Sequence, residues 1–187
     1  EGGAIVTSDQ DVLNQIKDSR LLGVEKDSIN RYQGKRSWNF NVRNQGWRYH
    51  MSNIFAAIGK AQLLNSKIIF KKRVSIVNKY IEYLKDYSEI EFLDIYNSGT
   101  VYHIMPILVD KENRNKLRSL LRKDNIETGI HYFPNHLLEY FKSDYKLPVA
   151  ESISERIISI PLHPSLTEAE QAFVIERLKY HIDILKN

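Results

Sequence analysis

The sequence contains no cysteine, which excludes disulfide bonds, cysteine-ligated zinc and catalysis by a thiol. It has no uninterrupted apolar run of the length that a membrane-spanning helix needs, so we expect no membrane anchor. The chain opens at Glu1 with two glycines and no basic segment, so we expect no signal peptide. It also opens without a methionine, so we expect the true N-terminus to lie elsewhere. These absences are compatible with a cytoplasmic protein.

A strong excess of charge of one sign is also lacking. The chain has 27 basic and 23 acidic residues, a net charge of +4. Its densest basic cluster, Lys71-Lys72-Arg73, lies inside a predicted helix and is expected to be that helix's solvated face. Nucleic-acid binding needs a concentrated basic face, so an unrelated basic α/β domain of that kind is disfavoured but stays open. Binding of small anionic, phosphate-bearing molecules explains the mild excess equally well.

What is present is typical of a globular α/β protein. A chain of 187 residues with 42% hydrophobic residues can bury a core and form one or two domains. The opening residues predict a short strand at 4–7 and a helix capped by Ser8 that ends near Gly23. Residues 27–43 are polar and aromatic and predict a long loop, of the kind that is usually functional or part of an interface.

The segment 45–63 combines a glycine, a cationic and aromatic cluster and the start of a helix. Trp47, Arg48, Tyr49 and His50 follow the glycine, and Ser52 is placed to cap the helix. Small residues along this helix allow another backbone to approach closely. The cluster therefore presents binding side chains on a rigid base, although core aromatics beside a solvated Arg48 are a second interpretation.

The rest of the chain predicts alternating helices and strands in one α/β layer with a mainly antiparallel sheet. The longest helical pattern covers 65–87, and we place a domain boundary along it, with one domain at 1–65 and the other at 66–187. The other predicted elements are strands at 90–93 and 101–109 joined by a turn at 97–99, a helix at 110–124, a short β-run at 127–132, a helix beginning at Pro148, a buried strand at 157–162, and a final helix with a capping box at Thr167.

Residues 129–136, GIHYFPNH, place His131, Tyr132 and His136 before and around a proline turn. Such side chains can bind a ligand or relay protons, and a turn packed by aromatic residues is the structural alternative. A zinc site needs at least one more ligand, and His163 is the only other candidate nearby in the sequence. We therefore predict no metal site.

Several of these segments resemble the DegT/DnrJ/EryC1/StrS family of sugar-nucleotide aminotransferases, which are fold-type-I enzymes with pyridoxal phosphate (PLP). QGWRYHMSNIFAAIGKAQL resembles the family pattern GxNYRMSxxQAAIGxxQL. LPVAESISERIISIPLHP resembles LPxAExxSxRxLSLPLHP, GIHYFPNH resembles a compressed GIxxxxHYPPLH, and EGGAIVTSD resembles EGGAIVTND. The resemblance covers essentially the whole chain. It implies that 1–65 ends the large PLP-binding domain and that 66–187, with a linking helix at about 66–87, forms the small C-terminal domain.

In that family the lysine that forms the Schiff base with PLP lies a few residues before the segment that corresponds to Glu1. No lysine here has that context; Lys17 follows it on a helix. The resemblance thus implies the C-terminal part of an aminotransferase, with the N-terminal half and every catalytic residue outside this chain. The chain alone is predicted to be inactive. A non-catalytic interaction module derived from such an enzyme is the alternative.

The resemblance also implies roles for particular residues. Arg48 stands where the family has an asparagine that reaches the PLP phosphate of the neighbouring subunit. A guanidinium can make a planar pair of hydrogen bonds to phosphate, so Arg48 is the predicted cofactor-binding residue. His131 and Tyr132 are the predicted substrate-binding residues. The implied activity transfers an amino group, from glutamate, to a nucleotide-linked keto-sugar for amino-sugar or surface polysaccharide biosynthesis, in a homodimer with a shared active site.

Overall fold

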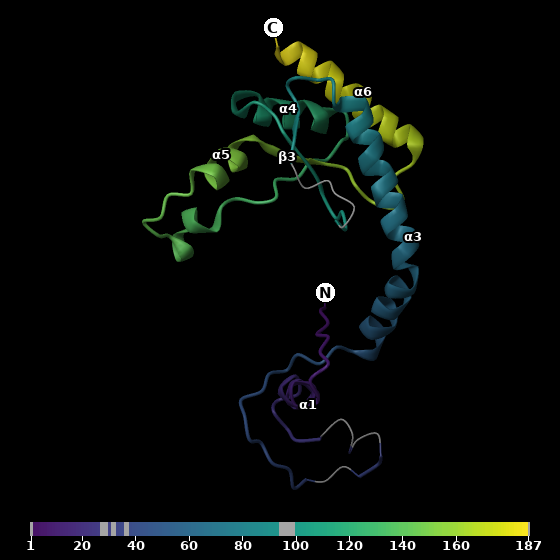
Figure 1. Cartoon of the computed structure of the whole chain (residues 1–187), viewed down its shortest axis with the longest axis vertical. Helices are drawn as coiled ribbons and strands as arrows, with labels where there is room; N and C mark the ends of the chain where they lie inside the picture. The colour runs from purple at the N-terminus through teal and green to yellow at the C-terminus, as the bar shows by residue number, and fades with distance from the viewer. Residues whose placement is uncertain (1, 27–29, 31–32, 36–37, 94–99, 187) are drawn as a thin grey trace. The chain divides into compact units, whose positions relative to one another are not determined.

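The computed structural model describes residues 2–26, 30, 33–35, 38–93 and 100–186 (Figure 1). The chain divides into two compact units, Glu1–Asn65 and Ser66–Asn187. The turn predicted at 97–99 and part of the loop predicted at 27–43 lie outside the described residues. None of the described helices combines the length and the apolarity needed to cross a membrane.

The first unit contains helix α1, Gln10–Ser19. Its cap is Asp9, whose carboxylate accepts hydrogen bonds from the amides of Asp11 and Val12 at 2.9 and 3.0 Å. The predicted cap Ser8 is therefore wrong by one residue. The helix also ends earlier than predicted, because the residues after it turn towards the segment that carries Arg48. The predicted strand at 4–7 is absent from these described residues.

Helix α3, Asn53–Leu84, is a single helix of 32 residues that crosses the boundary between the units. The sequence predicts two separate helical patterns here, one starting near Ser52 and one at 65–87, and the structure joins them into one helix. The predicted cap is confirmed, because the amide of Phe55 donates to the hydroxyl of Ser52 at 3.3 Å. Buried side chains occur only towards the C-terminal end of α3, at Ile76, Val77, Tyr80 and Leu84.

The second unit contains a three-stranded antiparallel sheet in the order β1-β2-β3. Its strands are short: β1 is Glu91–Phe92, β2 is Met105–Leu108 and β3 is Ile157–Ile160. All residues of β2 and β3 are buried, as the apolar sequence pattern predicts. The β-run predicted at 127–132 is reduced to one isolated bridge, between Gly129 and Ser159.

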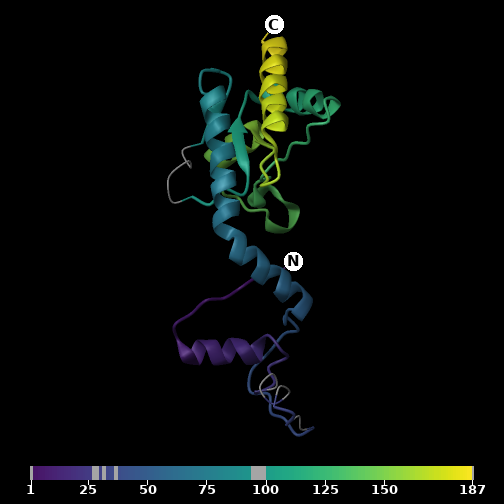
Figure 2. The same ribbon diagram turned by 90° about the vertical axis from the view of Figure 1, so that its right-hand side faces the viewer.

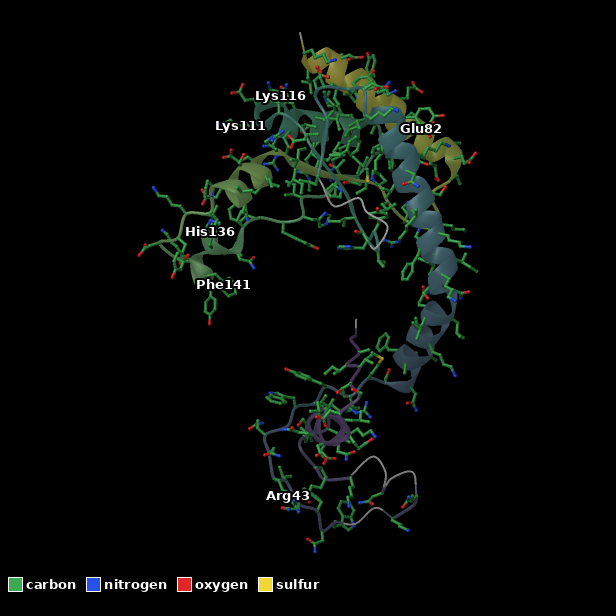
Figure 3. The ribbon with its side chains drawn as sticks, in the orientation of Figure 1. Arg43, Glu82, Lys111, Lys116, His136 and Phe141 are labelled. Atoms are coloured by element: carbon green, nitrogen blue, oxygen red, sulfur yellow. The ribbon has the colours of Figure 1, made fainter. Side chains whose placement is uncertain are left out.

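The helices of the second unit begin at the predicted signals. Helix α4, Lys111–Lys123, is capped by Asp110; α5, Pro148–Arg156, has proline in its first turn; α6, Glu168–Leu185, begins with a capping box at Thr167. Two short 3₁₀ helices, η1 at Asn135–Leu137 and η2 at Glu139–Phe141, lie between β2 and α5 in the sequence. They carry the labelled side chains of His136 and Phe141 (Figure 3).

The core of the second unit forms where α4, α6 and the C-terminal part of α3 meet the sheet. Helix α6 runs beside that part of α3 in both views (Figures 1 and 2), and the buried amide of Gln171 donates to the carbonyl of Ile76 at 2.7 Å. The hydroxyl of Tyr80 donates to the carbonyl of Pro161 at 3.0 Å, and burial raises the pKa of this tyrosine. The fully buried side chains include Val77, Leu84, Met105, Ile107, Leu117, Leu121, Ile158 and Leu178.

Candidate functional site

The segment that carries Arg48 is held in place by backbone hydrogen bonds to the residues after α1. The amide of Trp47 donates to the carbonyl of Ser19 at 2.7 Å, and the amide of Tyr49 donates to the carbonyl of Arg20 at 2.9 Å. The backbone of Arg48 itself forms an antiparallel bridge with Leu21. The position of Arg48 is therefore fixed by its own main chain rather than by packing of its side chain.

Two glycines permit this close approach. A Cβ atom on Gly46 would overlap the backbone of Leu22 and Gly23. Gly23 itself has a φ of +72°, a left-handed conformation that side chains disfavour. Next to this contact, the rings of Trp47 and Tyr49 stack with centroids 6.1 Å apart and planes 10° apart.

Arg48 lines a hollow of about 1420 Å³ within the first unit. The hollow is also lined by the cationic residues Lys17 and Arg20, and by His50 and Ser52. No acidic side chain is among the lining residues that the structure describes. The other lining residues are Gly2, Gly3, Ala4, Ile5, Leu13, Gln15, Ile16, Ser19, Trp47, Tyr49, Met51 and Phe55.

This set of donors suits a small anionic ligand with a planar ring. Three cations without a competing carboxylate favour phosphate electrostatically, and the guanidinium of Arg48 can donate two parallel hydrogen bonds to its oxygens. Exposed aromatic faces beside the cations provide an apolar surface for a ring. The residues present therefore fit a phosphorylated cofactor such as PLP.

The two predicted substrate-binding residues belong to the second unit and lie next to each other. The rings of His131 and Tyr132 meet edge to face, with centroids 4.9 Å apart and planes 83° apart. His131 is half-buried, and its Nδ1 lies 2.8 Å from the hydroxyl of Ser159. Tyr132 is 70% exposed, so its ring and hydroxyl are accessible to a ligand.

The third member of the GIHYFPNH segment, His136, has a different role. Its Nε2 lies 2.9 Å from a carboxylate oxygen of Glu151, and the same oxygen accepts a hydrogen bond from the amide of Leu147 at 2.9 Å. The hydrogen bonds from His136 and then from Leu147 lower the pKa of Glu151. This pair joins η1 to the start of α5. Among the residues that the structure describes, no group of three or more histidine, aspartate or glutamate side chains is placed to hold a metal ion.

The sequence analysis predicted roles for Arg48, His131 and Tyr132 but not for the residues that surround or hold them. Lys17 and Arg20 join Arg48 only because the chain folds back after α1. Ser159 is separated from His131 by 28 residues. A signal for Ser159 was nevertheless present, because it is the only polar residue in the buried run of β3.

Comparisons with known proteins agree with this fold. The sequence model of the DegT/DnrJ/EryC1/StrS aminotransferase family matches residues 1–179. An uncharacterized protein of Methanocaldococcus jannaschii is 31% identical, over 96% of this chain and 49% of its own length. The spore coat polysaccharide biosynthesis protein SpsC of Bacillus subtilis is 27% identical, over 100% of this chain and 50% of its own length.

Among solved structures, NtdA of Bacillus subtilis, with bound cofactor PMP, superposes with a TM-score of 0.80. It is 25% identical, over 95% of this chain and 41% of its own chain. The chain spans about half the length of the curated relatives it matches. The fold class predicted from the sequence, part of an α/β PLP-dependent transferase with a small antiparallel sheet, is confirmed. The chain belongs to the DegT/DnrJ/EryC1/StrS aminotransferase family.

Proposed function

We propose that this chain is the C-terminal part of a PLP-dependent aminotransferase that transfers an amino group, from glutamate, to a nucleotide-linked keto-sugar. The observation that carries the proposal is the cation-lined hollow around Arg48, on a chain that belongs to an aminotransferase family. The product would enter amino-sugar or surface polysaccharide biosynthesis. In support, the Bacillus subtilis relative is named a spore coat polysaccharide biosynthesis protein. We place the whole enzyme in the cytoplasm.

Arg48 would hold the phosphate of the cofactor. When bound, PLP supplies an electron sink for the carbon that loses or gains the amino group. A guanidinium can donate two hydrogen bonds to phosphate oxygens, and a hydrogen bond to a charged partner contributes roughly 1.5–3 kcal/mol. Lys17 and Arg20 add positive potential in the same hollow without needing direct contact.

His131 and Tyr132 would bind and orient the sugar. The imidazole and the phenol offer both donors and acceptors for sugar hydroxyls, and the exposed ring of Tyr132 offers an apolar face. Their edge-to-face contact restricts the orientation of both rings. We therefore assign the segment a role in binding.

The enzyme would need further parts. In line with the family resemblance, we propose a homodimer in which each active site is shared, with Arg48 reaching the cofactor of the neighbouring subunit. The lysine that holds the cofactor would belong to an N-terminal half that precedes the segment beginning at Glu1. On its own, this chain would lack transamination activity.

One observation favours a second function, a non-catalytic interaction module. Large apolar side chains of the first unit are exposed, among them Trp47 and Phe55, and such side chains are common in protein interfaces. A module of this kind would bind a protein partner through the first unit and would not need the cofactor.

A single assay separates the two functions. The longer protein that includes this chain is incubated with PLP, glutamate and a nucleotide-linked 4-keto-hexose, and formation of 2-oxoglutarate and amino-sugar is followed. Stoichiometric conversion is expected for the aminotransferase. A protein that binds no PLP and forms no amino-sugar from 4-keto or 3-keto substrates would contradict it and favour the interaction module.

A further inference from the structure

Ser159 is a polar residue in a strand that is otherwise apolar and wholly buried. Its neighbours in β3, Ile158 and Ile160, belong to the core, and Ser159 is only 6% exposed. A buried hydroxyl without a partner destabilises a protein, so its partner is informative. That partner is the Nδ1 atom of His131, at 2.8 Å.

The main chain holds the same two segments together. The amide of Gly129 donates to the carbonyl of Ser159 at 2.9 Å, and the amide of Ser159 donates to the carbonyl of Gly129 at 2.8 Å. This reciprocal pair fixes the strand segment two residues before His131. The hydroxyl and the imidazole are therefore brought together by backbone geometry rather than by chance contact of flexible side chains.

The imidazole of His131 also lies close to the backbone of Gly129. A Cβ atom at position 129 would overlap the His131 ring. The ring thus occupies the space that a side chain at 129 would need, and it contacts the Ser159 hydroxyl and the Tyr132 ring. With Nδ1 engaged, Nε2 is the ring nitrogen that remains to meet a ligand.

We propose that Ser159 is a positioning residue for His131: its hydroxyl holds Nδ1, and thereby sets the ring orientation in which Nε2 meets the nucleotide-linked sugar. The inference rests on the substrate-binding role proposed for His131, and it assigns a task to a core residue that touches no substrate. Gly129 also contributes to this positioning, because its lack of a side chain leaves room for the ring.

The first arm of the test needs no activity. The ¹⁵N chemical shifts of the His131 ring are measured in the whole chain, in Ser159→Ala and in Ser159→Thr. We expect the Nδ1 resonance and the tautomer ratio to change in Ser159→Ala and to be retained in Ser159→Thr, which keeps a hydroxyl. Ser154→Ala is the matched control, because its hydroxyl donates to the carbonyl of Glu151 at 2.7 Å, away from His131. An unchanged Nδ1 resonance in Ser159→Ala would overturn the proposal.

The second arm uses the complete enzyme. Loss of one hydrogen bond that orients a binding group predicts a KM for the keto-sugar raised roughly 2- to 10-fold in Ser159→Ala, with the glutamate half-reaction unchanged. Gly129→Ala, which displaces the ring without touching the hydroxyl, is expected to raise the same KM. If His131→Ala raises KM but both of these variants leave it unchanged, Ser159 has no positioning role.

The two arms also separate this proposal from the proposed function. A complete protein that performs the glutamate half-reaction, but in which Ser159→Ala and Gly129→Ala both leave KM unchanged while His131→Ala raises it, refutes the positioning role alone. A complete protein without PLP binding refutes the proposed function and, with it, the substrate side of this proposal. In that case the ring shifts still decide whether Ser159 holds His131.

Discussion

The two units differ in how far their apolar side chains are buried. The second unit buries a continuous core of apolar residues contributed by α3, α4, α6 and the sheet. In the first unit, the only buried residue among those that the structure describes is Gly23. Large apolar side chains such as Val6, Ile54 and Leu64 are exposed there.

The contrast is sharpest within one helix. Leu84, near the C-terminal end of α3, is 0% exposed, whereas Leu64, twenty residues earlier in the same helix, is 77% exposed. Helical propensity does not distinguish these leucines, so only the surroundings do. Because apolar burial is the main favourable contribution to folding, the second unit has its own source of stability and the first unit has little. Main-chain hydrogen bonds hold the segments of the first unit together in this chain.

Separating the two units tests this difference in burial most strongly. A fragment covering 66–187 is expected to unfold cooperatively in urea, because it contains the whole core. A fragment covering 1–65 is expected to show no cooperative transition and little amide protection, because it buries no apolar side chain among its described residues. Circular dichroism and hydrogen exchange provide the measurement. A cooperative transition in the 1–65 fragment would refute the contrast.

Truncating Leu84 and Leu64 tests the same difference in burial within helix α3. Leu84→Ala removes a fully buried side chain and is expected to lower the free energy of unfolding by about 2–5 kcal/mol. Leu64→Ala, the matched control, is expected to change it by less than about 0.5 kcal/mol, because the side chain is mostly in water. Urea denaturation of this chain measures both. Equal losses would mean that Leu64 is packed as tightly as Leu84.

The two helix caps allow a smaller test. Thr167→Ala removes the capping box of α6, which packs on the core, and is expected to lower the free energy of unfolding by about 1 kcal/mol. Asp9→Ala removes the cap of α1 in the first unit and is expected to leave the cooperative transition unchanged. A loss in Asp9→Ala as large as that in Thr167→Ala would show that α1 unfolds together with the core.

The smallest effect expected is a change in pH dependence. A carboxylate oxygen of Asp124 lies 2.6 Å from Arg177 and 2.6 Å from His181, and these hydrogen bonds lower the pKa of Asp124 below its ordinary value of 3.8. A pKa lowered by folding stabilises the protein above that ordinary value, and the stabilisation is lost as the pH falls below it.

Asp124→Asn is therefore expected to flatten the fall in stability between about pH 4 and lower pH values. Glu25→Gln is the control, because Glu25 pairs with Arg43 at 2.6 Å in the first unit, outside the cooperative core. Urea midpoints at several pH values measure both variants. An unchanged slope in Asp124→Asn would remove Asp124 from the acid sensitivity of the second unit.

Signals that act over a few residues made much of the second unit predictable. Asp110, Pro148 and Thr167 mark helix starts through contacts within one turn, and the structure places a helix after each. The buried strand at β3 follows from its apolar run, which only Ser159 interrupts. Strand lengths were overestimated, because the extent of pairing depends on partners far away in the sequence.

The first unit shows where such reasoning fails. Its apolar residues follow the same helical spacing as core residues, but Val12 on α1 is exposed. Helical spacing predicts which side chains share a face of the helix. It does not predict whether another part of the protein covers that face. The candidate site divides in the same way. The family resemblance, carried by local motifs, predicted roles for Arg48, His131 and Tyr132, whereas Arg20 and Ser159 come close to them only through the fold.

The central functional claim is that Arg48, on the exposed first unit, holds the phosphate of PLP. The most direct measurement is the dissociation constant of PLP for the complete protein, compared among the parent, Arg48→Ala and Arg43→Ala. Arg43 lies in the same unit (Figure 3), but it is paired with Glu25 and is not among the residues that line the hollow. We predict that Arg48→Ala weakens binding roughly 10- to 100-fold and that Arg43→Ala leaves it unchanged. Equal PLP affinity in Arg48→Ala and the parent would contradict the claim.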